Sequence, residues 1–460
     1  MIKSILDFGA KSDGSNSASS IQACIDEVSA AGGGTVVIPA GEFISGPFLI
    51  KNKVNLYLEE GSILKAAGNY EDYPEELMID KITNGVVNEY VLPRRAWIMA
   101  YQAKSIKITG PGTLDGNAES FIDKHGDVIH SMKAPVGGRS QYLERPFTIF
   151  LIDCPSLVLR DFTISNPAFW ALRLSGCDNL NIFGIKIMTD MKVPNADGID
   201  IDRCENVVIS NCHFETADDC ISIKSCSGTE IYGDTKNIKV EKCFFRTASG
   251  AITLGTESAG DIEDFYLSDC VVKDSHRGFA VRAREGGVIK NVIFKDSTLE
   301  THAYGQDWWG HGEALHVTAA SWDHPEGTTD GNPERLLEGT VENITFENLK
   351  VTTEGAILVL AIVGSVAAFS GNRSAIVNPA LARFLAFYTL ILTAIGLPAE
   401  AIGVLFVFDR ILDMARTVAR ENGIVVLGAN APADLAARVR KEGLAAVQGA
   451  PFLPRSVSVP

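Results

Sequence analysis

The sequence has 460 residues, with 41 lysines and arginines against 57 aspartates and glutamates, so its formal net charge is −16. Such a length gives room for a large core and for a second domain. A chain this acidic lacks the basic stripe that phosphate binding requires, which argues against nucleic acid as a partner. A polyanionic sugar would bind only where arginines and lysines gather locally.

The nine cysteines do not have the spacing of a metal site. None of them belongs to a Cys-x-x-Cys pair, so zinc is not expected, and the sequence predicts neither a metal nor a cofactor. Cys204, Cys212, Cys220, Cys226 and Cys243 recur among apolar residues, where a small buried thiol packs well. We expect reduced packing residues, with disulfides as the alternative.

The first residues give an expectation about location. Residues 1–4 lead directly into the apolar segment at 5–10, without the pattern of a signal peptide. The expected location is the cytoplasm, or the periplasm or the exterior if a signal peptide has been removed.

An amphipathic helix is predicted over residues 19–31, where it would cap the open end of a parallel stack. Short alternating segments at 105–108 and 156–159 resemble the first strands of such a stack. Together these segments predict that a repeating β-structure begins near the N-terminus.

A short motif then repeats along the chain, with an asparagine followed by an apolar residue, any residue and another apolar residue. The first two intervals are 27 and 31 residues, and the next two are 54 and 52. Alternating segments repeated at this period are typical of a solenoid of half-buried parallel strands. The recurring asparagine suggests a ladder of side-chain amides at one turn. The motif begins at Asn179, Asn206, Asn237, Asn291 and Asn343.

Three aspartates lie about one such repeat apart. Asp197 precedes the pair Asp218 and Asp219 by 21 and 22 residues. Adjacent coils of a parallel stack lie about 4.8 Å apart, so the three carboxylates should converge on one surface. Converging carboxylates catalyse glycoside hydrolysis. The alternative is that aspartates only cap solenoid turns, which is what we expect of Asp200 and Asp202.

The composition changes near residue 356, so we divide the chain into a β-helix domain at 1–355 and an Ala-rich apolar tail at 356–460. The tail has nine basic and six acidic residues, a formal charge of +3. Residues 384–408 carry one charge, Glu400, and are long enough to span a membrane. A buried or aggregation-prone helical pair is the alternative.

The ordered motifs of residues 5–355 resemble glycoside hydrolase family 28, the polygalacturonases and rhamnogalacturonan hydrolases. This resemblance implies an all-β fold, a right-handed parallel β-helix, and metal-free hydrolysis with inversion of galacturonic-acid-containing pectic chains. The motifs are DFGA at 7–10, GGGTVVIPAG at 32–41, GPGTLDG at 110–116, NPAFW at 166–170, NADGID at 195–200 and the pair Asp218-Asp219.

The resemblance also assigns roles. Asp219 matches the family's general acid, and Asp197 and Asp218 match the pair that holds and activates water. One carboxylic acid must keep its proton at working pH, and neighbouring carboxylates raise its pKa by repulsion. An inverting site is expected to separate its acid and base by about 6.5–9.5 Å.

Two positions depart from the family pattern. Ser249 stands where many members have a histidine that supports the catalytic carboxylates, and the family's Arg-Ile-Lys becomes Ala280-Val281-Arg282. Arg282 can replace the lysine, because a guanidinium pairs with a carboxylate, whereas Ala280 cannot replace the arginine. These departures make a rhamnogalacturonan-type or decorated galacturonide a candidate substrate.

We expect substrate contacts from residues around these motifs and from a Trp-rich insertion. Paired tryptophans can stack on the apolar faces of sugar rings, although core packing is the alternative. Arg277 or Arg284 is expected to compensate for Ala280. The expected substrate-binding residues are Asn195, Ser249, Lys224, Arg277, Arg282, Trp308 and Trp309.

Residues 384–420 resemble the last helix of dicarboxylate/amino acid:cation symporters. The spacing of Asp409, Arg410, Asp413 and Arg416 carries this resemblance. The other transmembrane helices of that family are missing, so we expect an inert fused fragment and an exposed last coil with poor solubility.

Three other functions remain open at this stage. The first is a non-catalytic galacturonide-binding solenoid, motivated by Ser249 and Ala280. The second is a polysaccharide lyase on the same fold, which would need a calcium cluster and a basic proton abstractor. A transporter is nearly excluded by the missing helices. The oligomeric state and the choice between endo and exo action also stay open.

Overall fold

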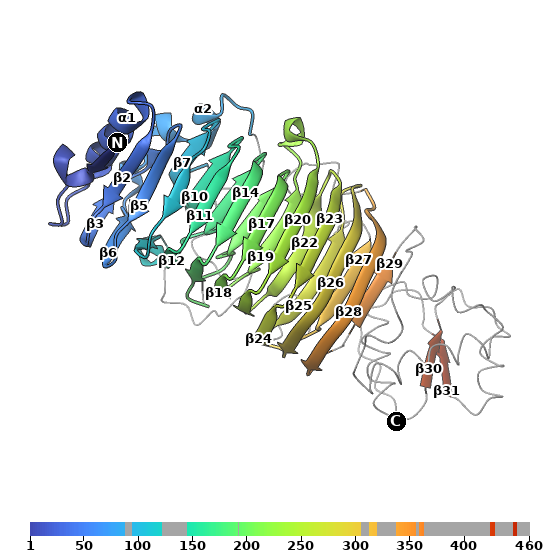
Figure 1. The fold of residues 1–460 in the computed structure, drawn as a ribbon. Coiled ribbons are helices and arrows are strands. Elements are labelled where there is room, and N and C mark those ends of the chain that lie inside the picture. Colours follow the sequence, from blue (N-terminus) through green and yellow to red (C-terminus); the bar gives the residue numbers. More distant parts are fainter. Residues whose placement is uncertain are drawn as a thin grey trace.

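The computed structural model describes residues 1–87, 94–121, 145–191, 193–304, 312–319, 337–355, 358–362, 424–427 and 445–448. Over residues 1–362 the described strands form an elongated stack with the N-terminus at one end (Figure 1). Two long parallel sheets run along this stack, and the segments alternate between them. This arrangement is the parallel β-helix that the repeats predict.

The larger sheet has 19 strands, and its pairings are parallel. Its strands are β1 (Ile2–Ser4), β2 (Gly34–Ile38), β3 (Gly41–Ser45), β5 (Val54–Leu58), β6 (Ser62–Ala66), β8 (Lys107–Thr109), β9 (Thr113–Asp115), β11 (Leu157–Arg160), β12 (Thr163–Ser165), β14 (Asp178–Phe183), β15 (Lys186–Met188), β17 (Glu205–Ser210), β18 (His213–Thr216), β20 (Thr235–Glu241), β21 (Phe244–Thr247), β23 (Ile262–Ser268), β24 (Val271–Ser275), β26 (Val288–Thr301) and β28 (Thr340–Thr353).

The second sheet has ten strands in the order of the chain. They are β4 (Phe48–Leu49), β7 (Ala96–Tyr101), β10 (Phe147–Ile152), β13 (Leu172–Ser175), β16 (Ile199–Asp202), β19 (Ile221–Ser225), β22 (Gly250–Ser258), β25 (Arg277–Ala283), β27 (Leu315–Ala319) and β29 (Leu358–Ile362). Because β29 pairs with β27, the parallel stack continues beyond residue 355. The domain boundary at 355/356 stays a prediction. A separate parallel pair joins β30 (Ile424–Leu427) and β31 (Ala445–Gln448).

The helical elements are short and few in the described chain. Helix α1 (Ala18–Ala30) is the expected N-terminal helix, and it buries Ile21, Cys24, Ile25 and Val28 against the end of the core. Figure 1 places it at the N-terminal end of the stack, which agrees with a capping role. The others are α2 (Ile79–Ile82) and the 3-10 turns η1 (Ile5–Phe8), η2 (Tyr70–Asp72), η3 (Glu75–Leu77), η4 (Ala118–Ser120) and η5 (Glu230–Tyr232).

Rows of identical or similar apolar side chains fill the interior. Parallel pairing in register places Leu180 beside Val207, and Val207 beside Ile238, so each coil continues the row of the one before. Aromatic rings stack in the same way, with the ring centroids of Phe214 and Phe245 5.4 Å apart. Burial of these rows is the main force that holds the coils together.

The predicted asparagine ladder is confirmed, and its cause is a backbone requirement. Asn179, Asn206, Asn237, Asn291 and Asn343 all have positive φ, between 52° and 58°. Asparagine adopts this left-handed conformation more readily than most residues. Its side chain also reaches the adjacent coil, because Asn237 Nδ2 donates to Asn206 Oδ1 over 2.6 Å. Four of the five asparagines link their turn to the adjacent coil in this way, through an asparagine or an aspartate, whereas Asn179 donates to Asp178 of its own coil.

All nine cysteines are buried with free thiols. Several recur at equivalent positions of successive coils, as when the Cys177 amide donates to Cys204 Sγ over 3.4 Å. Packing, which we favoured over disulfides, is thus their structural role.

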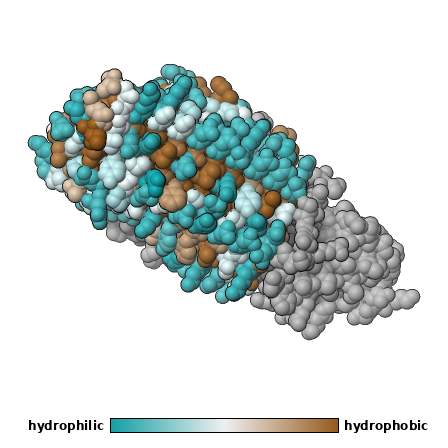
Figure 2. Space-filling model, viewed as in Figure 1, coloured by the Kyte–Doolittle hydropathy of each residue, from teal (hydrophilic) through white to brown (hydrophobic). Residues whose placement is uncertain are grey.

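Figure 2 shows one face of the stack, on which hydrophilic residues surround smaller apolar areas. Within the described chain, no helix is both long and apolar enough to cross a membrane. Residues 384–420, which resemble the symporter helix, lie outside the described residues, and so does the pair Trp308 and Trp309.

Candidate active site

The three aspartates converge as their spacing predicts. Asp197 lies two residues before β16 and Asp219 two residues before β19, and these strands pair with Ile199 opposite Ile221. One carboxylate oxygen from each of Asp197, Asp218 and Asp219 lies within 4.8 Å of the others. Gly198 permits the close approach of the coils, because a Cβ there would lie 2.3 Å from the Cys220 carbonyl oxygen. We call these three residues the aspartate trio.

Burial and mutual repulsion raise the pKa of two members of the trio. Asp197 is 5% exposed, and burial, followed by the charge of Asp218, raises its pKa well above the usual value. Burial and the charge of Asp219 raise the pKa of Asp218 to about 6. Carboxyl groups that interact so closely release their protons as a set. The trio can therefore hold a proton near neutral pH, as acid–base chemistry requires.

The third member, Asp219, is held by the next two coils. Its Oδ1 accepts hydrogen bonds from Ser249 Oγ over 3.0 Å and from the Gly250 amide over 2.9 Å. Arg277 Nη2 lies 3.9 Å from the same oxygen. A Cβ on Gly250 would lie only 2.7 Å from it, so glycine is needed at this position.

Lys224 lies beside the trio in an ion-paired cluster. Its Nζ is 2.7 Å from Glu257 Oε2 and 3.7 Å from Asp200 Oδ1. The same Nζ lies 4.7 Å from the centroid of the Trp170 ring, within the range of a cation–π contact. Asp200 is fully buried within ion-pair distance of the lysine, so it does more than cap a turn, and this burial raises its pKa well above the usual value. Asp202 likewise accepts a hydrogen bond from Thr229 Oγ1 over 2.9 Å inside the fold.

A group of arginines on and near β25 also lies close to Asp219. Burial, with the charges of Arg277 and Arg284, lowers the pKa of Arg282 to about 10. Arg284 Nη1 donates to Thr318 Oγ1 over 3.2 Å, and Ala280 is fully buried. Arg282, which is partly exposed, is therefore the arginine of this group that is best placed to meet an anionic substrate group.

Asn195, another expected contact, is held by a residue that the motifs did not reveal. Arg145 Nη2 donates to Asn195 Oδ1 over 3.3 Å, and its Nη1 donates to the Pro194 and Ala168 carbonyl oxygens. The guanidinium of Arg145 thus ties the loop before Asp197 to the preceding coil.

Sequence reasoning also gave no role to Glu257, to Trp170 of the NPAFW motif, or to the buried pair of Glu313 and His316, whose Oε1 and Nδ1 are 3.1 Å apart. Trp170 stands two residues before β13, the position that Asp197 takes before β16. An alignment of the coil sequences with one another would have identified Trp170 as a neighbour of the trio. The loops between coils vary in length, so the partners of Glu257 and Glu313 could not be found in that way.

Two acidic groups in the described chain could in principle hold a cation. One is the aspartate trio. The other joins Asp234, Asp261 and Glu263 on the surface, where Lys290 Nζ already lies 3.0 Å from Glu263 Oε1. The lysine supplies the positive charge there, so the second group offers little to a metal ion.

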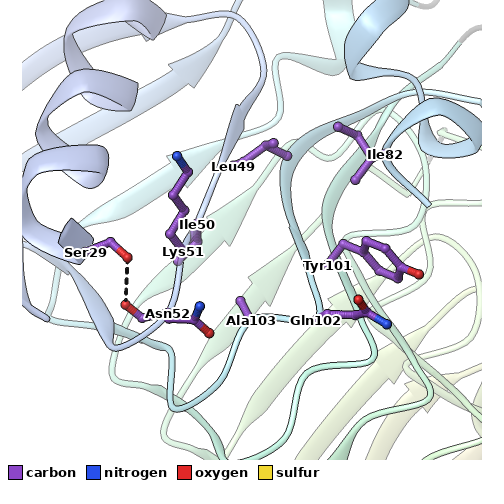
Figure 3. A pocket seen from close by; sticks show the side chains of 9 residues that line it. All are labelled: Ser29, Leu49, Ile50, Lys51, Asn52, Ile82, Tyr101, Gln102 and Ala103. Atoms are coloured by element: carbon purple, nitrogen blue, oxygen red, sulfur yellow. Dashed lines mark hydrogen bonds between the residues drawn. The ribbon is translucent and has the colours of Figure 1, made fainter. Parts of the chain in front are cut away.

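A separate hollow of about 290 Å³ lies between the first coils (Figure 3), and no residue of the trio lines it. Leu49, Tyr101 and Gln102 line it at the ends of β4 and β7, whereas the trio precedes β16 and β19. Several of its polar groups are engaged within the protein. Ser29 Oγ donates to the Asn52 carbonyl oxygen, and Gln102 Nε2 donates to Asp153 Oδ2. We assign no chemistry to this hollow.

Comparison with known proteins agrees with this geometry. The model of the glycosyl hydrolases family 28 matches residues 65–307, which span β7 to β26 and the whole trio. The chain belongs to glycoside hydrolase family 28. It is similar to a probable polygalacturonase of Vitis vinifera, with 26% identity over 65% of this chain and 60% of the relative. An exo-poly-alpha-D-galacturonosidase of Dickeya chrysanthemi is 24% identical over 75% of this chain and 62% of the relative.

The chain thus spans about 60% of the length of these two curated relatives. Among solved structures, the family 28 exopolygalacturonase of Yersinia enterocolitica has a TM-score of 0.62 and 21% identity, over 81% of this chain and 69% of that one. The exopolygalacturonase of Thermotoga maritima has a TM-score of 0.59 and 20% identity, over 80% and 92%. At these identities the structural likeness establishes the shared β-helix fold.

Proposed function

We propose that this chain is an inverting glycoside hydrolase that cleaves galacturonic-acid-containing polysaccharides or oligosaccharides. The observation that carries the proposal is the aspartate trio, in which Asp197 and Asp219 are buried and one oxygen from each residue lies within 4.8 Å of the others, with raised pKa values at Asp197 and Asp218. Family membership and the names of the relatives support the pectic substrate class.

In the proposed reaction, Asp219 gives its proton to the glycosidic oxygen as the bond from this oxygen to the anomeric carbon breaks. A water held by Asp197 and Asp218 forms the new bond to that carbon, and its proton passes to one of these two carboxylates. Two hydrogen bonds of about 2.8 Å that meet at the tetrahedral angle span about 4.6 Å. One oxygen from each residue of the trio lies within 4.8 Å of the others, so two of its carboxylates are close enough to accept hydrogen bonds from one water.

This spacing between nearest oxygens is shorter than the separation of about 6.5–9.5 Å expected between an acid and a base that face each other across a water. We infer that the water lies to one side of the trio, with Asp219 reaching the leaving oxygen from the other side. The inverting outcome follows from the family resemblance and needs a direct stereochemical test.

The substrate carboxylate is proposed to pair with Arg282. This residue is the partly exposed cation of the arginine group, and a guanidinium binds a carboxylate through two parallel hydrogen bonds. Because Lys224 is already paired with Glu257, a second uronic acid would have to displace that carboxylate. Nine buried cysteines without a disulfide suit a reducing compartment, so we propose a cytoplasmic enzyme.

Product analysis tests this function. The full chain and its Asp219→Asn variant would be incubated with homogalacturonan, rhamnogalacturonan and unsaturated galacturonide oligosaccharides. We expect new reducing ends from at least one substrate with the wild type, and a loss of about 10²–10⁴-fold with Asp219→Asn, the scale of general acid catalysis. Binding without new reducing ends would indicate a non-catalytic solenoid, and new unsaturated ends would indicate a lyase. Either result would refute the proposal.

A further inference from the structure

Ser249 stands between an arginine and the proposed general acid, and the chemistry of its neighbours fixes the direction of its hydrogen bonds. Arg277 Nη2 lies 3.0 Å from Ser249 Oγ, which in turn lies 3.0 Å from Asp219 Oδ1. An arginine side chain only donates, so Ser249 Oγ accepts from Arg277. The single hydroxyl proton of Ser249 is thereby directed to Asp219.

Both residues lie beneath the surface that a substrate would contact. Ser249 is 1% exposed and Arg277 is 2% exposed. The Arg277 amide also donates to the Ser249 carbonyl oxygen over 2.7 Å, so the backbone and the side chain of this arginine both donate to the same serine. This burial argues against the sugar contacts that the sequence suggested for these two residues.

The hydrogen bonds distinguish the two oxygens of Asp219. Oδ1 accepts from Ser249 Oγ and from the Gly250 amide, which occupies its lone pairs with two donors. A proton on the carboxylic acid is therefore favoured on Oδ2. The Asp219 side chain retains 12% exposure, which allows a proton on Oδ2 to reach a bound sugar.

We propose, as a refinement that rests on the proposed hydrolase function, that Ser249 and Arg277 are positioning residues that fix Oδ2 as the proton-donating oxygen of Asp219. Neither residue touches the substrate. Arg277 orients the Ser249 hydroxyl, and this hydroxyl, with the Gly250 amide, prevents the carboxyl group of Asp219 from rotating.

The charged groups that act on Asp219 define what the variants must leave unchanged. Asp197, Asp200 and Asp218 supply negative charge, and Arg277 and Arg282 supply positive charge. Ser249→Ala leaves all five in place and removes only the hydroxyl. A hydrogen bond to a carboxylate favours its ionised form, and the Ser249 hydroxyl also acts to lower the pKa of Asp218, so its loss makes the coupled trio keep its proton to higher pH.

The test compares Ser249→Ala with Ser249→Thr, which keeps a hydroxyl, and with Ser222→Ala. Ser222 is a matched control on β19, because its buried Oγ has no hydrogen-bond partner among the described residues. We expect Ser249→Ala to lower kcat about ten- to a hundredfold with KM nearly unchanged, the scale of one hydrogen bond to a charged group. We also expect the alkaline limb of kcat/KM to move to higher pH. Ser249→Thr should restore both, and Ser222→Ala should change neither.

A second readout does not depend on activity. The carboxyl carbon of Asp219 would be titrated by NMR in wild type and in Ser249→Ala, with assignment from Asp219→Asn. A midpoint that rises in Ser249→Ala supports the positioning role, and an unchanged midpoint overturns it. If the wild type cleaves no substrate, the hydrolase function fails while this titration still decides the role of Ser249. If Asp219→Asn is inactive but Ser249→Ala keeps the wild-type kcat and pH profile, the hydrolase stands and the positioning role is wrong.

Discussion

Lys224 Nζ lies 2.7 Å from Glu257 Oε2, across the neighbouring strands β19 and β22. Lys224 is 5% exposed, and the carboxylates of Glu257 and Asp200 raise its pKa despite burial, which acts in the opposite direction. A lysine that the sequence suggests as a free contact for an acidic sugar is thus a buried cation between two carboxylates. Its first role is to stabilise the carboxylates of Asp200 and Glu257 beside the trio.

Loss of this cation should destabilise the fold. Lys224→Met leaves Asp200 and Glu257 beside each other without their cation, and removal of one partner from a buried pair costs about 3–5 kcal/mol. Denaturant unfolding at neutral pH would measure the change. Lys239→Met is the control, because the exposed Lys239 Nζ lies 2.8 Å from Glu241 Oε2, where solvent screens the pair and little stability should be lost. Equal losses in both variants would contradict the role of Lys224.

The contribution of Asp218 to the free energy of unfolding should be favourable at acid pH and should be lost as the pH rises. Its pKa is raised from 3.8 to about 6, so the native state holds a proton that the unfolded chain releases. This stabilising contribution is complete below about pH 4 and is lost as the pH rises through about 6. Asp218→Asn should therefore be more stable than the wild type at pH 7.5, by about 1–3 kcal/mol, and should have no such advantage at pH 4.

Asp274→Asn is a comparison variant for which the expected change in stability has the opposite sign. Hydrogen bonds from His302 and Arg246 lower the pKa of Asp274 despite partial burial, so this variant should lose stability at neutral pH. Thermal unfolding of both variants across pH 4–8 would measure the two trends. If the stability of Asp218→Asn equalled that of the wild type at every pH, the raised pKa of Asp218 would be disproved.

A methyl group at Gly250 should disturb catalysis more than folding. The new Cβ would lie 2.7 Å from both Asp219 Oδ1 and Thr253 Oγ1, so the carboxyl group must rotate or shift. A small misplacement of a catalytic group costs about 10²-fold in rate. We expect Gly250→Ala to lower kcat on that scale, with a melting temperature within a few degrees of the wild type. A variant with unchanged kcat would show that the position of Asp219 is not critical.

Much of the fold could be predicted because its rules are local. The left-handed turn at Asn206 and its equivalents selects asparagine, and the alternation after it marks one buried face. In a parallel stack, residues one repeat apart become neighbours. The spacing of Asp197 and Asp219 in the sequence was therefore enough to predict that their carboxylates converge.

The surroundings of the trio could not be predicted in the same way. Ser249 reaches Asp219 over 30 residues and Glu257 reaches Lys224 over 33, so the separation varies with each loop. Whether a serine hydroxyl or an arginine faces the substrate or an adjacent coil depends on the local path of the backbone. Ser249 and Arg277 therefore looked like substrate contacts in the sequence, although the fold buries both.

The stereochemistry of the first product tests the central claim most directly. Proton NMR during cleavage of an α-linked galacturonide would show which anomer appears before mutarotation. Attack by a water held at Asp197 and Asp218 on the face opposite the leaving group predicts the β-anomer first, with no unsaturated product. Initial release of the α-anomer would mean retention and would contradict the roles given to the three aspartates.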